Sequence, residues 1–89
     1  MNRGVPLDNF LISTIATTCN VDPSAVELGT RISDLNLDSL GLISIVSQLS
    51  ITYDVEITAD ETMEFFEAVR IADVVSLARR ITTRAAVPS

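Results

Sequence analysis

The sequence predicts an all-α protein: a small up-and-down four-helix bundle with three main helices, one short helix and a long crossover loop after the first helix. Apolar residues recur at helical spacing in several segments. One short stretch alternates like a strand, but the chain has no second stretch that could pair with it. With 47% hydrophobic residues and no Trp, the core must consist mainly of Leu, Ile, Val and Ala.

The length of 89 residues suits one domain over 1–89. We expect a folded core at about 7–83, with flexible tails at 1–6 and 84–89. The first helix is expected over about 7–18, and Asn20 tolerates the left-handed conformation that often ends a helix.

The connection before the second helix is longer than most loops between packed helices. It runs from about Glu27 to Asp38. Loops of this length are usually functional or held in place by their own side chains. We expect Ile32, Leu35 and Leu37 to anchor this one.

A second helix is expected from Ser39 to Tyr53, capped by Asp38 or Ser39. Steps of about 100° per residue place most of its apolar side chains on one face, which we expect to be the core face. That face holds Leu42, Ile43, Ile45, Val46, Leu49 and Tyr53. The opposite side carries an outward stripe of Leu40, Ser44, Ser47 and Ile51. Apolar residues on a polar face favour contact with a partner.

The last third of the chain predicts a loop and two further helices. A short helix near 61–67 is expected to be capped by Thr58 or Asp60. Its core residues are expected to be Met63, Phe65 and Phe66. The acidic residues around it are expected to form a solvated face, because acid–base chemistry requires a pocket that separates their pKa values. The final helix is expected over about 70–83, with Arg79, Arg80 and Arg84 complementing its dipole.

Composition and charge exclude several classes of function. The net charge is −6 and the chain has no Lys, whereas nucleic-acid binding relies on clustered basic side chains. The chain also lacks His, which removes the common zinc sites and the Ser/His/Asp and Cys/His catalytic arrangements. Cys19 is the single cysteine, and a small core residue is favoured over a reactive thiol. No apolar run approaches about 18 residues, so we expect a cytoplasmic protein without a membrane partner.

Ser39 lies at the step between the long connection and the second helix. The spacing of the first ligands of an EF-hand calcium loop is present at Asp34, Asn36 and Asp38. The rest of the loop does not match, because Ser39 stands where the loop has Gly and Ile45 where it has its final Glu. We therefore expect no metal site. A catalytic serine needs a base, and without His or Lys we expect no catalytic residue. Two interpretations of Ser39 remain, a helix cap and a modification site. The second suits this position, because a phosphodiester at a helix N-terminus would meet backbone N–H groups.

The stretch Leu35-Asn36-Leu37-Asp38-Ser39-Leu40 resembles the attachment motif of acyl carrier proteins, Asp-Ser-Leu preceded by a hydrophobic residue. Tyr53-Asp54-Val55-Glu56-Ile57 is similar to the loop after the family's second helix, and Arg70-Ile71-Ala72-Asp73-Val74-Val75 to its final helix. The likeness covers about residues 7–83. It implies a non-catalytic carrier in which Ser39 receives 4′-phosphopantetheine from coenzyme A through a phosphopantetheinyl transferase. The thiol of that arm would hold an acyl group as a thioester, with Asp38 beside the attachment point.

The second helix departs from the pattern of fatty-acid carriers. Their outward stripe is typically acidic, whereas this helix carries no charge between Asp38 and Asp54. We therefore expect apolar and hydrogen-bonded docking with little electrostatic steering. The expected docking residues are Leu40, Gly41, Ser44, Ser47 and Ile51. Gly41 is unusual inside a helix and would allow close approach of a partner or of the arm.

The expected function is thus a discrete acyl carrier protein in polyketide, specialised fatty-acid or related secondary-metabolite biosynthesis. Its partners would be a phosphopantetheinyl transferase and acyl-loading and condensing enzymes, such as a transferase, ligase or ketosynthase. A stand-alone peptidyl or aryl carrier is one alternative. A helical protein-interaction module, in which Ser39 is only a cap, is another. We expect a monomer, and the sequence does not identify the acyl group, its chain length or the pathway.

Overall fold

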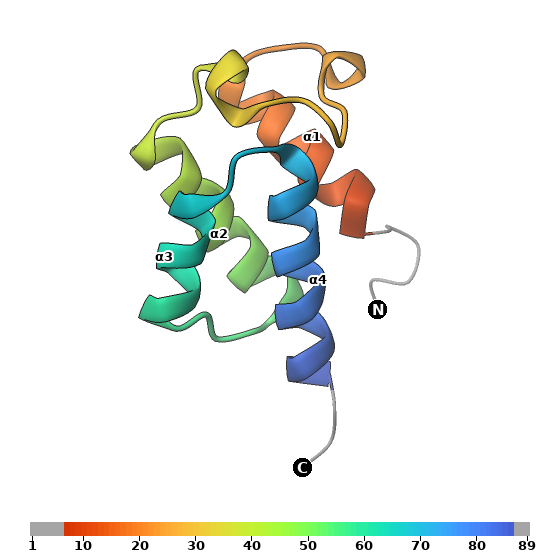
Figure 1. Cartoon of the computed structure of the whole chain (residues 1–89). Coiled ribbons are helices and arrows are strands. Elements are labelled where there is room, and N and C mark those ends of the chain that lie inside the picture. The colour runs from red at the N-terminus through yellow and green to blue at the C-terminus, as the bar shows by residue number, and fades with distance from the viewer. Residues whose placement is uncertain (1–6, 87–89) are drawn as a thin grey trace.

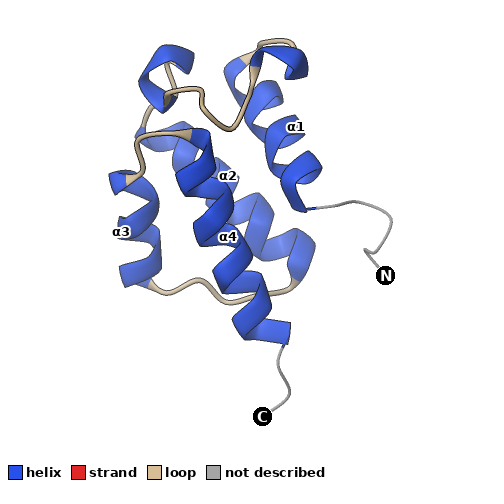
Figure 2. Ribbon diagram, turned by 45° about the vertical axis from the view of Figure 1, so that its right-hand side comes forward, coloured by secondary structure: helices blue, strands red, loops and turns tan. Residues whose placement is uncertain are grey.

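The computed structural model describes residues 7–86, and these form an up-and-down bundle of α-helices (Figure 1). The helices are α1 (Leu7–Cys19), α2 (Ser39–Tyr53), α3 (Ala59–Glu67) and α4 (Ile71–Ala86). Two short 3₁₀ helices, η1 (Pro23–Ala25) and η2 (Ile32–Leu35), lie in the crossover between α1 and α2. Figure 2 shows helices and loops but no strand in this part of the chain, so the predicted all-α bundle is confirmed.

Most helix boundaries agree with the prediction, and α4 differs most. It begins at Ile71 instead of Arg70 and continues to Ala86. Residues 84–86, expected in the flexible tail, are therefore helical. The Arg84 guanidinium binds the Glu61 carboxylate of α3 at 2.9 Å, a contact between helices that supports this extra turn. The other predicted tail residues, 1–6 and 87–89, lie outside the described residues.

The core lies where all four helices meet. Its largest fully buried side chains include Phe65, Leu11, Ile15, Ile45, Leu49, Ile71 and Ile81. Tyr53 is half-buried and packs its ring edge against Phe10 of α1, with ring centroids 5.4 Å apart. The apolar interior is thus assembled mainly from aliphatic side chains, as the composition predicted.

Three residues expected in the core are exposed instead. Met63 is 57% exposed and Phe66 37%, because α3 turns only one face toward the bundle and Phe65 occupies it. At about 100° per residue, Met63 and Phe66 lie well away from Phe65 around the helix. Ile43 is 45% exposed because it lies at the edge of the α2 core face, about 100° from Leu42. The core prediction was wrong for these three positions.

The crossover is anchored on the start of α4. Ile32 and Leu35 are buried and Leu37 packs partly against the core, which confirms these anchors. Backbone hydrogen bonds add to the packing. Ile32 N–H donates to Val69 O at 2.9 Å, Ile71 N–H to Thr30 O at 2.9 Å and Ala72 N–H to Leu28 O at 2.8 Å. The middle of the crossover, at residues 28–32, is therefore held by residues about forty positions later in the chain.

A reciprocal capping box starts α3. The Thr58 hydroxyl accepts a hydrogen bond from Glu61 N–H at 3.1 Å, and the Glu61 carboxylate accepts one from Thr58 N–H at 2.9 Å. The hydrogen bond from Thr58 N–H, followed by the nearby Arg84 charge, lowers the pKa of Glu61 from its ordinary value of 4.5. The arginines of α4 pair with carboxylates of other helices, Arg79 with Asp8 and Arg80 with Glu64, in addition to lying near the helix end.

We predict that the ionised Glu61 stabilises the fold above its ordinary pKa and loses this effect in acid. A lowered pKa in the folded state means that stability is present above the unfolded value and is lost as pH falls through the folded value. Glu61→Gln retains the capping-box hydrogen bond but not the charge. The difference in unfolding free energy between wild type and Glu61→Gln should therefore shrink in urea titrations between about pH 7 and about pH 3. Glu67→Gln is the control, and a pH-independent difference for Glu61→Gln would contradict the prediction.

Candidate functional site

Asp38 caps the N-terminus of α2 and leaves the Ser39 side chain uncommitted. The Asp38 carboxylate accepts a hydrogen bond from Gly41 N–H at 2.8 Å, and its carbonyl accepts one from Leu42 N–H at 2.9 Å. The sequence left Asp38 and Ser39 as alternative caps, and the structure selects Asp38. Ser39 is exposed, and within residues 7–86 its hydroxyl makes no hydrogen bond.

The first turn of α2 also leaves backbone donors free. Within the described residues, the N–H groups of Ser39 and Leu40 have no acceptor, as expected for the first residues of a helix. Such groups, together with the positive end of the helix dipole, favour a negatively charged group. A free hydroxyl and two free backbone donors therefore occur at the same place.

Asn36 turns the chain toward this helix start. Its φ of 56° and ψ of 34° are in the left-handed region, which few residues other than Gly and Asn adopt readily. Its N–H donates to Ser33 O at 3.4 Å and ends η2. The chain thereby passes from the buried Leu35 to the exposed Asp38 within three residues.

The predicted outward stripe of α2 is exposed. Leu40 is 76% and Ile51 77% exposed, and Ser44 and Ser47 are also exposed. Their role in docking stays a prediction. The structure adds apolar residues that sequence reasoning did not assign to a surface: Ile43, Met63, Phe66 and Val69. The helical offset of Met63 and Phe66 from Phe65 was the available signal, since one face of a short helix cannot bury all three.

Gly41 allows the crossover and α1 to approach α2 closely. A Cβ atom at this position would lie 2.6 Å from Leu37 Cδ1, 3.3 Å from Asp38 Oδ1 and 3.4 Å from Thr18 Cγ2. The space that Gly41 leaves is therefore taken largely by the chain itself. Close approach was predicted for a partner or an arm, and here the close approach is made by Leu37.

Two grooves flank the start of α2. On the α3 side, a hollow of about 520 Å³ begins at Ser39 and is lined mainly by apolar residues, among them Ile32, Leu42, Phe66 and Val69. On the α1 side, a hollow of about 500 Å³ is lined by Asp38, Leu40 and Gly41 at one end. It includes Thr18 and Ser44, which also line a further hollow of about 320 Å³ between α1 and α2.

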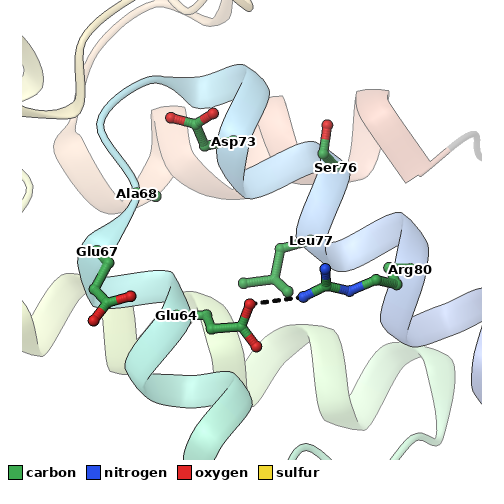
Figure 3. Close-up of a pocket in the computed structure, with 7 residues that line it drawn as sticks. All are labelled: Glu64, Glu67, Ala68, Asp73, Ser76, Leu77 and Arg80. Carbon is green, nitrogen blue, oxygen red and sulfur yellow. Dashed lines mark hydrogen bonds and ion pairs between the residues drawn. The ribbon is translucent and has the colours of Figure 1, made fainter.

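Another groove, of about 410 Å³, lies between α3 and α4, far along the chain from Ser39 (Figure 3). Two of its three acidic groups, Glu64 and Asp73, have structural partners. Glu64 binds Arg80 at 2.8 Å, and Asp73 accepts hydrogen bonds from the backbone N–H groups of Arg70 and Val69, which lower its pKa. No group of three or more His, Cys, Asp or Glu side chains in residues 7–86 is arranged to hold a metal ion.

Cys19 lies at the end of α1 in the same groove as Asp38 and is partly buried. Burial raises the pKa of its thiol, and the negative charge of Asp38 raises it further. Both effects disfavour the thiolate, which is the reactive form. Cys19 therefore resembles a small core residue more than a reactive thiol, as the sequence favoured.

We predict that the substitution Asp38→Asn removes the charge of Asp38 but keeps its role as the cap of α2. Asn caps helices about as well as Asp, so the stability should change little, whereas Asp38→Ala should lose about 1 kcal/mol. Removing the charge should lower the pKa of the Cys19 thiol. The pH dependence of alkylation by iodoacetamide measures that pKa. Asp34→Asn, which changes the same charge within the same groove, is the control and should leave the alkylation profile unchanged.

Comparison with known families agrees with this geometry. A family model described as a phosphopantetheine attachment site matches residues 9–78, most of the chain, while no curated protein matches significantly. In residues 7–86 no helix has the length and apolar character needed to cross a membrane. Domains of this family carry covalent 4′-phosphopantetheine, are generally non-catalytic and work with a phosphopantetheinyl transferase and biosynthetic enzymes. The chain belongs to the phosphopantetheine-binding family of carrier domains.

Proposed function

We propose that this chain is a discrete acyl carrier protein that holds acyl groups as thioesters on a 4′-phosphopantetheine arm attached to Ser39. The observation that carries the proposal is the free Ser39 hydroxyl at the N-terminus of α2, within the region matched by the family model. Asp38 performs the capping that Ser39 could otherwise perform. The exposed serine is therefore available to a modifying enzyme.

The residues around Ser39 suit the phosphodiester of the arm. The unpaired N–H groups of Ser39 and Leu40 provide donors for an anion at this helix end. When bound, the group supplies a thiol on a long flexible arm, and that thiol forms the thioester. Asp38 acts as a positioning residue, because its hydrogen bond to Gly41 N–H fixes the first turn on which Ser39 lies.

The sequence lacks the side chains that most often act as the base in acyl transfer. It has no His and no Lys, and the Asp38 carboxylate is engaged in the helix cap. We therefore assign the chemistry to its partners: a phosphopantetheinyl transferase and acyl-loading and condensing enzymes. The carrier presents the thioester to them, and we propose that it does so as a monomer.

The uncharged α2 supports a specialised pathway, such as polyketide, specialised fatty-acid or related secondary-metabolite biosynthesis. An acidic α2 would steer basic partner surfaces over distance, whereas an uncharged helix relies on short-range contact. The same neutrality suits a stand-alone peptidyl or aryl carrier, which is the second candidate. The two differ in the enzyme that loads them, a malonyl transferase for the first and an adenylating enzyme for the second.

We predict one phosphopantetheine addition, located at Ser39. The protein should gain the mass of one arm when incubated with coenzyme A and a broad-specificity phosphopantetheinyl transferase. Ser39→Ala should gain none. Ser76→Ala is the control, because Ser76 is an exposed helical serine on α4 and not one of the expected docking residues, and it should be modified like wild type. Intact-protein and peptide mass spectrometry measure both outcomes, and equal modification of Ser39→Ala would overturn the proposal.

We also predict that docking depends on apolar contact and only weakly on salt. Leu40→Ala should lower kcat/KM of the transferase about fivefold, which corresponds to the roughly 1 kcal/mol of a moderately important interface residue. Wild-type kcat/KM should change less than about threefold between low and high salt, since α2 offers no charges to screen. Leu28→Ala, at a 47% exposed leucine in the crossover, is the control for loss of an exposed apolar side chain. A steep salt dependence would contradict the prediction.

A further inference from the structure

The first turn of α4 is capped by the crossover and not by the residue before it. The N–H groups of Ile71 and Ala72, which have no partner inside the helix, donate to carbonyl oxygens of the crossover at 2.9 and 2.8 Å. Arg70 has no acceptor in its side chain, and its guanidinium donates instead to Gly29 O at 3.0 Å. The start of α4 and the crossover segment 28–32 therefore hold each other in place.

Asp73 fixes the connection between α3 and α4 that makes these contacts. Its carboxylate oxygen Oδ2 accepts hydrogen bonds from Val69 N–H at 3.1 Å and from Arg70 N–H at 3.0 Å. The carbonyl oxygen of Val69 in turn accepts a hydrogen bond from Ile32 N–H in the crossover, at 2.9 Å. One side chain thus holds Val69 and Arg70, two residues that bind the crossover directly.

The same connection and the crossover form the hollow at Ser39. Val69 lines it from the connection, Ile32 and Ser33 from the crossover, and Asp38 and Ser39 from the start of α2. Asp38 follows Ile32 by six positions, and the short helix η2 occupies the first part of that interval. A displacement of Val69 would therefore change both the wall of the hollow and the support of the residues that precede Ser39.

We propose that Asp73 is a positioning residue for the modification of Ser39, an inference that rests on the proposed attachment there. Asp73 lines the groove between α3 and α4 (Figure 3) and not the hollow at Ser39, so it acts through Val69 and the crossover. Loss of its carboxylate leaves the N–H groups of Val69 and Arg70 without this acceptor and loosens the support of the first turn of α2. A smaller fraction of molecules then presents Ser39 in the arrangement that the transferase binds, and the apparent affinity falls by the same fraction.

Two substitutions of Asp73 and one control separate this role from a general loss of stability. Asp73→Ala removes the acceptor, whereas Asp73→Asn keeps an oxygen at the same position, and Asn caps helices about as well as Asp. Thr58→Ala is the control, because it removes the side-chain cap of α3, which accepts from Glu61 N–H and not from the crossover. The kinetics of arm attachment are measured with coenzyme A and a broad-specificity transferase, at a temperature at which every variant is folded.

The KM of the transferase for the carrier should rise about fivefold in Asp73→Ala at unchanged kcat, the effect of a typical lost cap. Asp73→Asn and Thr58→Ala should retain the wild-type KM. Amide hydrogen exchange gives a readout that needs no arm, because exchange of Ile32 N–H should accelerate about fivefold in Asp73→Ala and not in Thr58→Ala. An unchanged KM or an unchanged Ile32 exchange rate in Asp73→Ala, or an equal rise in KM for either of the other variants, would overturn the proposal.

Should Asp73→Ala fail to fold, the comparison is made between two arginine variants of α4 and its start. Arg70→Ala removes the bond to Gly29 O, and Arg79→Ala removes an exposed arginine that binds Asp8 of α1. The KM should then rise in Arg70→Ala alone, and equal values would overturn the inference. Failure of the wild type to gain the arm would instead overturn the proposed function, a result that intact mass distinguishes from slow modification of a variant.

Discussion

The position of Ser39 depends on the attachment of the crossover to the start of α4. Backbone hydrogen bonds join the segment around Thr30 to the segment around Ile71, and the buried Ile32 and Leu35 hold the same region from inside. Only with this segment fixed can the left-handed turn at Asn36 bring Asp38 to the beginning of α2. These contacts offset the conformational entropy cost of ordering a long loop, which becomes a defined support for Ser39, the proposed attachment residue.

In the proposed function, capping and modification at the start of α2 belong to different side chains. A serine that capped the helix itself would have its oxygen engaged with a backbone N–H group, and a modifying enzyme would have to break that bond. Asp38 removes this conflict by accepting the hydrogen bond from Gly41 N–H. Burial and, secondarily, this carboxylate raise the pKa of the nearby Cys19 thiol, which disfavours its reactive thiolate form.

The surface around Ser39 combines an uncharged α2 with two chemically different grooves. The exposed Leu40 and Ile51 lie on an α2 that has no charged side chain, while the exposed Phe66 and Val69 lie along the apolar groove toward α3. The groove toward α1 offers hydroxyl and amide groups instead. The two grooves therefore present chemically different walls on either side of α2.

The features set by neighbouring residues could be predicted from the sequence. The bounds of α2, its capping at Asp38 or Ser39, the anchors of the crossover and the exposed stripe through Leu40 and Ile51 all follow from local periodicity and capping chemistry. The resemblance to the carrier family was also readable, because the similar motif lies in one continuous stretch. Each of these features depends on residues close together in the chain, so the local amino-acid sequence is enough to predict it.

Contacts between helices decided the rest. Periodicity alone could not show that α3 buries Phe65 and exposes Met63 and Phe66, because that depends on how much of a short helix the other helices cover. The extension of α4 to Ala86 accompanies the contact of Arg84 with Glu61, and the choice between the two caps depended on the turn before α2. The polar groove exists only because α1 and α2, separated by the crossover in sequence, lie side by side. Such features depend on contacts between segments that are far apart in the chain, and no single segment encodes those contacts.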